Sequence, residues 1–282
     1  MSRVAIVTGA ARGIGAATVR GLAAEGWTVV AVDVCRDDPR LGYGLGTRAE
    51  LEAVVADAAR AAGDGGAADA AAADDARLNA PRVQAVVADA IDPVAMAAVV
   101  AEAERVHGGL DAFVAAAAGI SGGAPQWELP PDQERAVLEL CLDSVLVAAR
   151  VAIPALLRRP EPRSGRFLAV ASAAATRGLP MLAASCAAKA GVAGLVRALG
   201  AELADSGVTA NAVSPGSTRT PMLEATARLY GLPDGADAFA AQQPQRRLLE
   251  PAEVAALLVW LAGPASGGLT GAILPVDAGL GL

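Results

Sequence analysis

The stretch VAIVTGAARGIGAAT, residues 4–18, joins a short apolar run to a glycine-rich turn and the start of a helical pattern. Gly9, Gly13 and Gly15 follow the spacing G-x-x-x-G-x-G within it. Glycines at such a turn let backbone N–H groups approach a pyrophosphate, and the positive end of the following helix dipole favours the anion. An ordinary glycine-rich turn would show the same letters. Its place in the first βα unit of an alternating chain predicts dinucleotide binding instead.

Seven short apolar runs alternate with longer helical patterns along the chain. Nearly continuous apolar runs are typical of parallel strands that are buried on both faces. The alternation predicts an α/β fold, a doubly wound (Rossmann) seven-stranded parallel sheet with helices on both faces. Because there is no internal repeat and no clean linker, we expect one domain over residues 1–282. The expected strands are 3–9, 27–33, 82–89, 111–119, 166–172, 208–214 and 271–277, and the expected helices are 13–25, 47–62, 93–107, 132–157, 180–204 and 250–262.

Composition argues against several classes of protein. Of the 282 residues, 54% are hydrophobic and 19% charged, which allows a substantial core. The net charge of −7 and the lack of a basic stripe argue against nucleic-acid binding. No apolar run reaches about 18 residues without a charge or a breaker, and the N-terminus lacks signal-peptide architecture. Three unpatterned cysteines and a single histidine predict no metal site and free thiols in a reducing, cytoplasmic compartment.

Two segments break the rhythm of strands and helices. Residues 34–80 form a long excursion after the second expected strand, and the second half is rich in Ala, Asp and Gly. We expect an acidic, partly helical or mobile surface insertion there. Residues 217–249 have an irregular pattern that is typical of a substrate lid over a crevice. The apolar side chains of this expected lid include Met222, Leu223, Leu229 and Tyr230.

Carboxylates end two of the expected strands. Asp33 closes the second strand, where a carboxylate can accept hydrogen bonds from the adenosine ribose and would repel a 2′-phosphate. We therefore expect NAD rather than NADP, although the nearby Arg12 and Arg36 could offset this repulsion. Asp89 ends the third strand and either touches the adenine edge or caps the helix that begins near Asp92. The sequence leaves both roles of Asp89 open.

Further motifs extend this pattern over essentially the whole chain. They are TGAARGIG at 8–15, AAAG at 116–119, AVASAAA at 169–175 and NAVSPGSTRTPM at 211–222. With Asp33 and a helix that carries Lys189, their order resembles the short-chain dehydrogenase/reductase family. The segments VDVCRDDP, TRAEL, CAAK and SPGSTRTPML are more narrowly similar to its mycofactocin-coupled branch. That branch has a longer segment after the second strand and is thought to hold its nicotinamide cofactor without ready exchange.

The resemblance implies which residues line the cofactor site. The turn at Pro215 and Gly216, followed by Thr218 and Thr220, would receive the nicotinamide carboxamide. Lys189 would bond the nicotinamide ribose. A solvated lysine or one that acts directly on the substrate are the alternatives. The other implied cofactor-binding residues are Gly9, Arg12, Gly13, Ile14, Gly15, Asp33, Asp89, Ala117 and Gly119.

The resemblance also implies the catalytic groups, and here the sequence departs from the family. In the family a Tyr phenol exchanges a proton with the substrate oxygen, and a Lys lowers the Tyr pKa from about 10. A Ser steadies that oxygen, and an Asn holds a water that relays protons. Ser172 and Lys189 match the Ser and the Lys, but Ser185 stands at the Tyr position and Cys141 at the Asn position. Two of the four proton-handling groups are therefore replaced.

The replacement at position 185 has a physical consequence. Ser185 and Lys189 are four residues apart and share one helix face. A Ser hydroxyl stays near the backbone, can bond the carbonyl of residue 181 and has a pKa far above that of a phenol. General acid–base help is worth about 10²–10⁴ in rate, so the usual alcohol and ketone chemistry should be crippled.

Other side chains could in principle replace the phenol. The chain has two tyrosines, Tyr43 in the excursion and Tyr230 in the expected lid, and Tyr230 could swing over the site. Cys141 is a possible nucleophile, but thiols on apolar helices, Cys186 included, are usually packing residues.

Three functional hypotheses follow from this mixed set of residues. The first is an NAD-dependent oxidoreductase acting on CH–OH/C=O groups of a small apolar or biosynthetic substrate with altered proton handling. The second is a non-redox biosynthetic enzyme on the same scaffold. The third is a silent subunit of a hetero-oligomer with an active homologue. The resemblance implies a homodimer or homotetramer built on helices 132–157 and 180–204.

Overall fold

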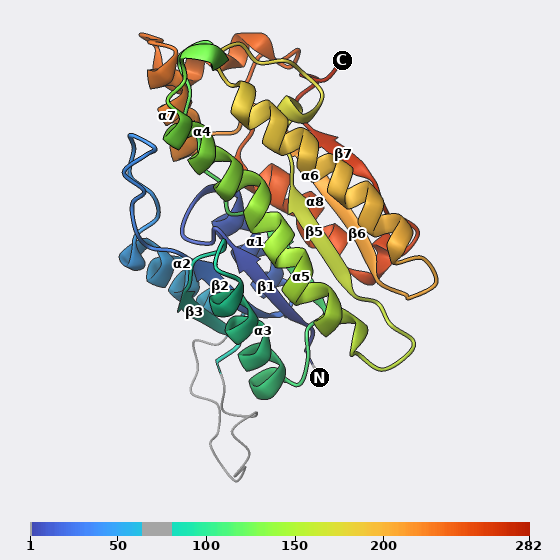
Figure 1. The fold of residues 1–282 in the computed structure, drawn as a ribbon. Helices are drawn as coiled ribbons and strands as arrows, with labels where there is room; N and C mark the ends of the chain where they lie inside the picture. The colour runs from blue at the N-terminus through green and yellow to red at the C-terminus, as the bar shows by residue number, and fades with distance from the viewer. Residues whose placement is uncertain (1, 64–80) are drawn as a thin grey trace.

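The computed structural model describes residues 2–63 and 81–282. Seven parallel strands form one sheet in the order β3-β2-β1-β4-β5-β6-β7 (Figure 1). The fold is therefore the predicted Rossmann-type α/β architecture, and every expected strand is present. Their bounds are β1 Val4–Thr8, β2 Thr28–Asp33, β3 Val83–Val87, β4 Ala112–Ala115, β5 Arg166–Val170, β6 Thr209–Pro215 and β7 Ile273–Val276.

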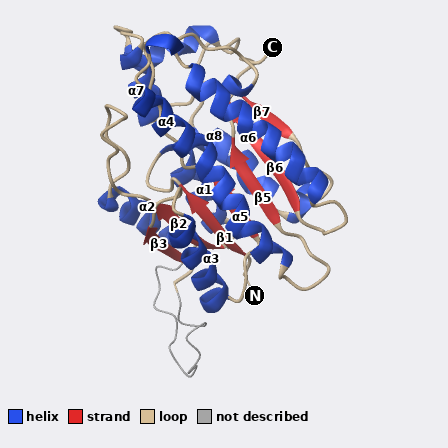
Figure 2. Cartoon of the chain, in the orientation of Figure 1, coloured by secondary structure: helices blue, strands red, loops and turns tan. Residues whose placement is uncertain are grey.

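Helices cover both faces of the sheet (Figure 2). On one face, α1, α2 and α8 pack against a core that contains Ile14 at its edge and the fully buried Leu22 and Leu258. On the other, α3, α5 and α6 pack around the stacked rings of Phe113 and Phe167. The helix bounds are α1 Gly13–Ala24, α2 Arg48–Ala61, α3 Pro93–His107, α4 Pro131–Leu138, α5 Ser144–Leu157, α6 Ala183–Glu202, α7 Pro221–Leu229 and α8 Pro251–Ala262.

The order of the strands creates the place for a site. β1 pairs with both β2 and β4, so the chain crosses from one half of the sheet to the other next to β1. In open α/β sheets the crevice at the carboxyl ends of the strands beside such a crossover is where ligands bind. The glycine-rich turn between β1 and α1 lies at this point.

Two predicted helices differ from their expected form. The helix expected over 132–157 is interrupted by a π-helical turn, η2, over Glu139–Asp143, because one extra residue is accommodated there. The helix expected over 180–204 begins only at Ala183, since Pro180 precedes it and Met181 has a left-handed backbone with φ of 60°. Shorter 3₁₀ turns are η1 Gln126–Glu128, η3 Ala173–Ala175, η4 Gly235–Gln242 and η5 Pro264–Ser266.

The two unusual segments each contain a helix, and the one after β2 is the helix expected over 47–62. The excursion after β2 contains the ordinary crossover helix α2, which begins with a capping box between Thr47 and Glu50. The extra chain that precedes α2 is the loop 34–47, and the Ala-rich part at 64–80 lies outside the described residues. The segment 217–249 contains α7 and η4, and a β-bridge between Thr218 and Leu249 closes its base. The segment is thus partly helical, and its expected role as a substrate lid stays a prediction.

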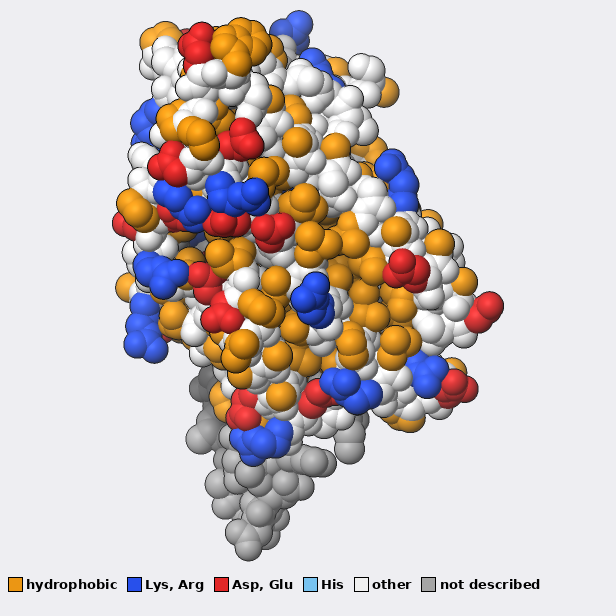
Figure 3. Space-filling model, in the orientation of Figure 1, with side chains coloured by type: hydrophobic (Ala, Val, Ile, Leu, Met, Phe, Trp, Pro, Cys, Tyr) orange, Lys and Arg blue, Asp and Glu red, His pale blue; other side chains and the backbone are white. Residues whose placement is uncertain are grey.

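An apolar surface runs over the helices α4 to α6. Figure 3 shows hydrophobic side chains gathered across the middle of this face, where α5 lies in Figure 1. Leu146 on α5 remains 41% exposed. Among the described residues, the stretch Pro131–Leu157 is long and apolar enough to cross a membrane by length and composition alone. Since buried helices of globular domains pass the same test and α5 packs on the sheet, this is weak evidence for a membrane.

Candidate active site

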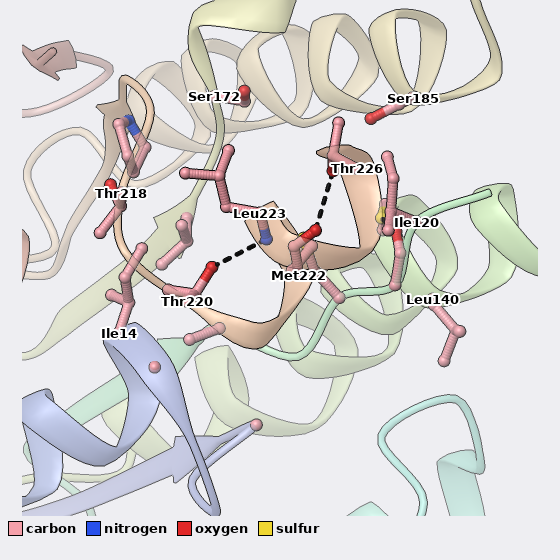
Figure 4. Close-up of a pocket in the computed structure, with 18 of the residues that line it drawn as sticks. Ile14, Ile120, Leu140, Ser172, Ser185, Thr218, Thr220, Met222, Leu223 and Thr226 are labelled. Atoms are coloured by element: carbon pink, nitrogen blue, oxygen red, sulfur yellow. Dashed lines mark hydrogen bonds between the residues drawn. The ribbon is translucent and has the colours of Figure 1, made fainter. Parts of the chain in front are cut away.

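A cavity of about 570 Å³ opens at the carboxyl ends of β1, β2, β4, β5 and β6. α1 begins at one end of the cavity, and α7 with the segment 217–249 covers the other (Figure 4). Every residue that the sequence assigns to the cofactor or catalytic set lines this cavity. The sequence-predicted residues, dispersed from 9 to 220, are thus brought together at one site.

The glycine turn forms a cradle that side chains would fill. A Cβ at Gly9 would lie 2.8 Å from the Ala116 carbonyl oxygen, and one at Gly15 would overlap the Gly9 carbonyl. Gly13 has φ of 56°, a left-handed conformation that favours glycine. The N-cap residue of α1, Arg12, provides no side-chain cap, so the positive end of the helix faces the cavity uncapped. This arrangement fits a diphosphate.

Asp33 lies at the end of β2, as predicted, and is fixed in place by the backbone. Its carboxylate accepts hydrogen bonds from the N–H groups of Ala11, at 3.0 Å, and Cys35, at 3.1 Å. Arg12 turns away from it and donates to the Gly44 carbonyl at 2.7 Å. Within the described residues Asp33 forms no ion pair, and its free charge at the cavity would repel a 2′-phosphate, which favours NAD.

The structure excludes one of the two roles expected for Asp89, that of capping α3. α3 is capped by Asp92, whose carboxylate accepts from the N–H groups of Val94 and Ala95 at 2.8 and 3.1 Å. Asp89 lines the cavity and forms an ion pair with Arg36 at 2.9 Å. Arg36, the second arginine that could have offset the negative charge of Asp33, is therefore paired with Asp89 instead.

Thr8 binds the backbone of the strip that follows β4, residues 116–119. The sequence analysis did not predict this role. Its hydroxyl accepts hydrogen bonds from the N–H groups of Ala116, at 3.1 Å, and Ala117, at 3.3 Å. A polar residue directly before Gly9, at the end of a buried strand, was the available signal. Gly119, the last residue of the strip, lies against the side chains of Leu41 and Leu140. At each of the expected cofactor-binding glycines, an added Cβ would displace a neighbouring group.

Ser172 and Lys189 lie beside each other at the end of β5. The Ser172 hydroxyl accepts from the N–H of Ala174 at 3.1 Å. The Lys189 ammonium reaches back from α6 and donates to the Val170 carbonyl oxygen at 2.7 Å. Burial lowers the pKa of Lys189 below its ordinary 10.5, because a charged ammonium loses its hydration there. A solvated lysine is therefore excluded.

Ser185 lines the cavity one turn before Lys189, as the spacing predicts (Figure 4). Its side chain is 8% exposed. Within residues 2–63 and 81–282 the Ser185 hydroxyl has no hydrogen-bond partner, so the bond to the carbonyl of residue 181 that the sequence suggested is not formed. The hydroxyl is left available to a ligand.

The cysteines have packing roles. Cys141 is buried in the π-helical turn and donates a hydrogen bond from its thiol to the Gly119 carbonyl at 3.1 Å. The Cys186 sulfur lies between the Leu179 N–H and the Arg177 carbonyl, turned toward the loop before α6. Only Cys141 reaches the cavity wall, where its thiol supports the strip at Gly119.

Side-chain hydrogen bonds fix the turn after β6 and the start of α7. Thr218 donates to the Gly216 carbonyl at 3.0 Å, and Thr220 caps α7 by accepting from the Leu223 N–H at 3.2 Å. Gln243, fully buried, accepts from the Ser217 N–H at 2.8 Å and donates to the Arg247 carbonyl. The sequence analysis missed Gln243, because nothing in the sequence marks a buried amide.

Apolar side chains form the end of the cavity that faces away from α1. Tyr43 from the loop 34–47 accepts a hydrogen bond from the Ile120 N–H at 3.3 Å, and burial raises its pKa to about 12. The Tyr230 hydroxyl donates to the Pro180 carbonyl at 2.5 Å and in this structure makes no hydrogen bond to Lys189 or Ser172. The wall is otherwise made by Ile120, Leu179, Leu182, Met222, Leu223 and Phe239.

Comparison with known proteins identifies the class of protein that this fold and site define. A family model described as Enoyl-(Acyl carrier protein) reductase matches residues 48–281, and one described as short chain dehydrogenase matches residues 3–42. The chain therefore belongs to the short-chain dehydrogenase/reductase family.

Individual relatives share this scaffold over almost their whole length. The chain is 36% identical to cis-4-hydroxycyclohexanecarboxylate dehydrogenase of Sinomonas cyclohexanicum, over 98% of this chain and 96% of that one. It is 33% identical to (-)-trans-carveol dehydrogenase of Rhodococcus erythropolis, with 98% and 96% covered. The crystal structure of carveol dehydrogenase from Mycobacterium avium in complex with NAD superimposes with a TM-score of 0.87 at 26% identity, covering 99% and 97% of the two chains.

Proposed function

We propose that this chain is an NAD-dependent oxidoreductase that acts on a CH–OH/C=O group of a small apolar or biosynthetic substrate, with a proton relay that lacks the family phenol. The observation that carries the proposal is the uncapped, side-chain-free cradle at the start of α1, which opens into the same cavity as Lys189. The NAD-bound relative adds support, because its fold matches over nearly the whole chain.

The residues of the cavity fit a dinucleotide in extended form. Gly9, Gly13 and Gly15 would hold its diphosphate at the positive end of α1, and Asp33 would accept hydrogen bonds from the adenosine ribose. Lys189 would hold the second ribose, and the turn at 215–220 the carboxamide. When bound, NAD supplies the hydride acceptor or, in its reduced form, the donor.

The chain's own residues would orient the substrate more than they would transfer its proton. The Ser172 hydroxyl can donate to the substrate oxygen while it accepts from Ala174. The Ser185 hydroxyl is too weakly acidic to carry a proton at neutral pH, so the proton must pass through the substrate, a bound water or Lys189. Burial lowers the pKa of Lys189, so a larger fraction of its amine is neutral and free to accept a proton, although each neutral amine is a weaker base.

The narrower assignments are part of the same proposal. We assign the chain to the mycofactocin-coupled branch, because the loop 34–47 adds Tyr43 and Gly46 to the cavity wall. The loop is held at two points: the Arg12 guanidinium donates to the Gly44 carbonyl, and Arg40 forms an ion pair with Glu139 of η2 at 2.9 Å. We also propose a cytoplasmic homo-oligomer that pairs through the apolar face of α5.

A second candidate function is a silent subunit that pairs with an active homologue. The observation that favours it is the joint replacement at Ser185 and Cys141 beside an apolar face on α5, where Leu146 is 41% exposed. An active partner would then supply the missing phenol in its own cavity. A non-redox reaction in the same cavity is the remaining alternative.

Nucleotide binding tests the proposal directly. Purified protein is denatured to identify any retained nucleotide, and the emptied, refolded protein is titrated with NAD, NADH and NADPH by calorimetry. We expect NADH to bind more tightly than NADPH. If no nucleotide is released and none binds to folded protein, the oxidoreductase proposal fails and a role without cofactor takes its place.

A further inference from the structure

Tyr43 brings a phenol from the loop 34–47 to the apolar end of the cavity, which the proposed function leaves for the substrate. The loop follows β2, on the side of the cavity where the adenosine would lie. The Tyr43 side chain nevertheless packs against the apolar cluster of Ile120, Leu182 and Ala225. Two of these, Ile120 and Leu182, belong to the cavity wall that faces away from α1. A residue of the cofactor side thus contributes to the wall that a substrate would meet.

The Tyr43 hydroxyl has a proton to donate. Its oxygen accepts a hydrogen bond from the Ile120 N–H at 3.3 Å, and its O–H has no acceptor among the described residues. A phenol can accept and donate at the same time, so a ligand can supply the missing acceptor. Burial raises the pKa of Tyr43 to about 12, so the phenol keeps its proton at neutral pH.

Two other hydroxyls on this wall already donate to the backbone. Thr226 donates to the Met222 carbonyl at 2.8 Å, as Figure 4 shows. Tyr230 donates to the Pro180 carbonyl. Since a hydroxyl has one proton, neither can donate to a ligand without losing its present bond. Tyr43 differs from both, because its proton is free within the part of the chain that the structure describes.

The charged side chains of the cavity lie elsewhere. Among the described residues that line it, they are Arg12, Asp33, Asp89 and Lys189. Arg12 and Asp89 are each bound to the loop 34–47, and the proposed function places Asp33 and Lys189 at the two riboses. A carboxylate or phosphate on the substrate would therefore lack a cation at the apolar end, and its burial there would be costly. A neutral polar group is favoured instead.

We propose that Tyr43 is a specificity-determining residue whose phenol donates a hydrogen bond to a neutral acceptor oxygen of the substrate, remote from the reacting carbon. The reacting C–O group would lie beside Ser172 and Ser185. The second oxygen would be a carbonyl, ether or hydroxyl across an apolar ring or chain. This inference rests on the proposed oxidoreductase function and deepens it by naming the substrate class: uncharged, largely apolar alcohols or ketones with a second oxygen.

Binding of ketones to the NAD-loaded protein tests the inference apart from turnover, because a ketone has no hydride to give at its carbonyl carbon. 4-Methoxycyclohexanone carries a second oxygen, and 4-ethylcyclohexanone has a methylene in its place. Tyr43→Phe should lower the affinity for the methoxy ketone by about three- to tenfold, the effect of one neutral hydrogen bond, and leave that for the ethyl ketone unchanged. Calorimetric titration measures both affinities, and circular dichroism confirms that the variant is folded.

Two further comparisons use the same protein. The matched variant Tyr230→Phe removes a phenol whose proton is already bonded to Pro180, so it should not lower the affinity for the methoxy ketone relative to the ethyl ketone. 4-Oxocyclohexanecarboxylate should bind more weakly than either neutral ketone, because it would bring a charge to the apolar end.

The phenol can also be observed directly. The chain has two tyrosines, so ¹³Cζ-labelled tyrosine gives two phenol resonances, which Tyr43→Phe and Tyr230→Phe assign. The methoxy ketone should shift the Tyr43 resonance further than the ethyl ketone does. Equal shifts from the two ketones contradict a hydrogen bond to the second oxygen and overturn the inference.

The other contrary outcomes are equally definite. The inference fails if neither ketone binds, if Tyr43→Phe leaves the affinity for the methoxy ketone unchanged or lowers both affinities equally, or if the carboxylate binds most tightly. A matching loss of NADH affinity in folded Tyr43→Phe also overturns it, since the phenol would then serve the nucleotide. If wild-type protein binds no nucleotide at all, the proposed function fails instead, so the two failures are distinguishable.

Discussion

The Lys189 ammonium and the Val170 carbonyl oxygen are 2.7 Å apart, and this hydrogen bond ties the middle of α6 to the end of β5. Lys189 therefore points into the sheet end of the cavity, although Ser185 lies on the same helix face one turn earlier. In a protein core such a cation is costly unless something besides a single carbonyl interacts with it. We therefore expect Lys189 to lower the stability of the protein when the cavity is empty.

Lys189→Met should stabilise the empty protein near neutral pH. Removal of a buried charge is often neutral or stabilising, here by about 1–3 kcal/mol after the lost hydrogen bond is counted. Because the folded-state pKa is lowered, the unfolded chain binds more protons between that value and 10.5, so wild-type stability rises with pH across this window. Denaturant unfolding at several pH values should show the advantage of Lys189→Met shrinking as the pH approaches 10.5.

The double variant Ser185→Tyr/Cys141→Asn should restore the family proton relay. A phenol at 185 lies on the same helix face as Lys189, and general acid–base catalysis contributes about 10²–10⁴ in rate. Oxidation of simple secondary alcohols with NAD should rise by that order. The matched control, Ser185→Phe/Cys141→Asn, has the ring without the hydroxyl and should stay at the wild-type rate. An equal gain in both variants would mean that bulk, not the phenol, accounts for the change.

Asp33→Asn should weaken NADH binding and reduce the preference for NADH over NADPH by about tenfold. A hydrogen bond to a charged group is worth about 1.5–3 kcal/mol, and the amide loses the charge while it keeps one acceptor. Calorimetric titration of both nucleotides measures the change. Asp57→Asn, on the exposed face of α2 where Asp57 pairs with Arg20 and Arg60, is the control and should leave both affinities unchanged.

Asp89→Ala and Asp92→Ala should separate binding from helix capping. Asp92 caps α3, so its loss should lower the free energy of unfolding by about 1 kcal/mol without altering NADH affinity. Asp89 lines the cavity, and its ion pair with Arg36 is partly exposed, so its loss should reduce NADH affinity with little effect on stability. The reverse pattern would assign the capping role to Asp89.

Gly15→Ala should cost both stability and nucleotide binding, since the added Cβ would overlap the Gly9 carbonyl. Forced overpacking of this kind costs about 1–3 kcal/mol. Gly194 is an exposed residue in the helix α6, and an added Cβ there would meet open space. Gly194→Ala should therefore raise stability by about 0.5–1 kcal/mol. Thermal melts and NADH titrations of both variants distinguish steric overlap at the glycine turn from the general effect of replacing Gly by Ala in a helix.

Much of this molecule could be predicted from local patterns. The seven apolar runs became seven parallel strands, because strands buried on both faces leave an unmistakable signature. The turn glycines, Asp33 and Ser172 lie at strand ends, where the topology places them at one edge of the sheet. Lys189 could be placed one turn after Ser185 because helix spacing is regular.

Other features could not be predicted, because they depend on contacts between distant segments. The π-helical turn around Cys141 arises where α4 and α5 meet the strip at Gly119, which has no local code. The hydrogen bonds of Arg12 and Arg36, which decide the charge around Asp33, depend on the path of the loop 34–47. The buried amide of Gln243 is similarly visible only once the segment 217–249 is folded over the cavity.

The cradle and the cover of the cavity touch at one point. A Cβ on Gly13 would lie 3.1 Å from the Thr220 methyl carbon, and Thr220 is the residue that starts α7. The glycine turn of the proposed nucleotide site is thus packed directly against the first residue of the proposed cover. A larger side chain at position 13 would push against Thr220, so one substitution there would disturb both the glycine turn and the start of α7.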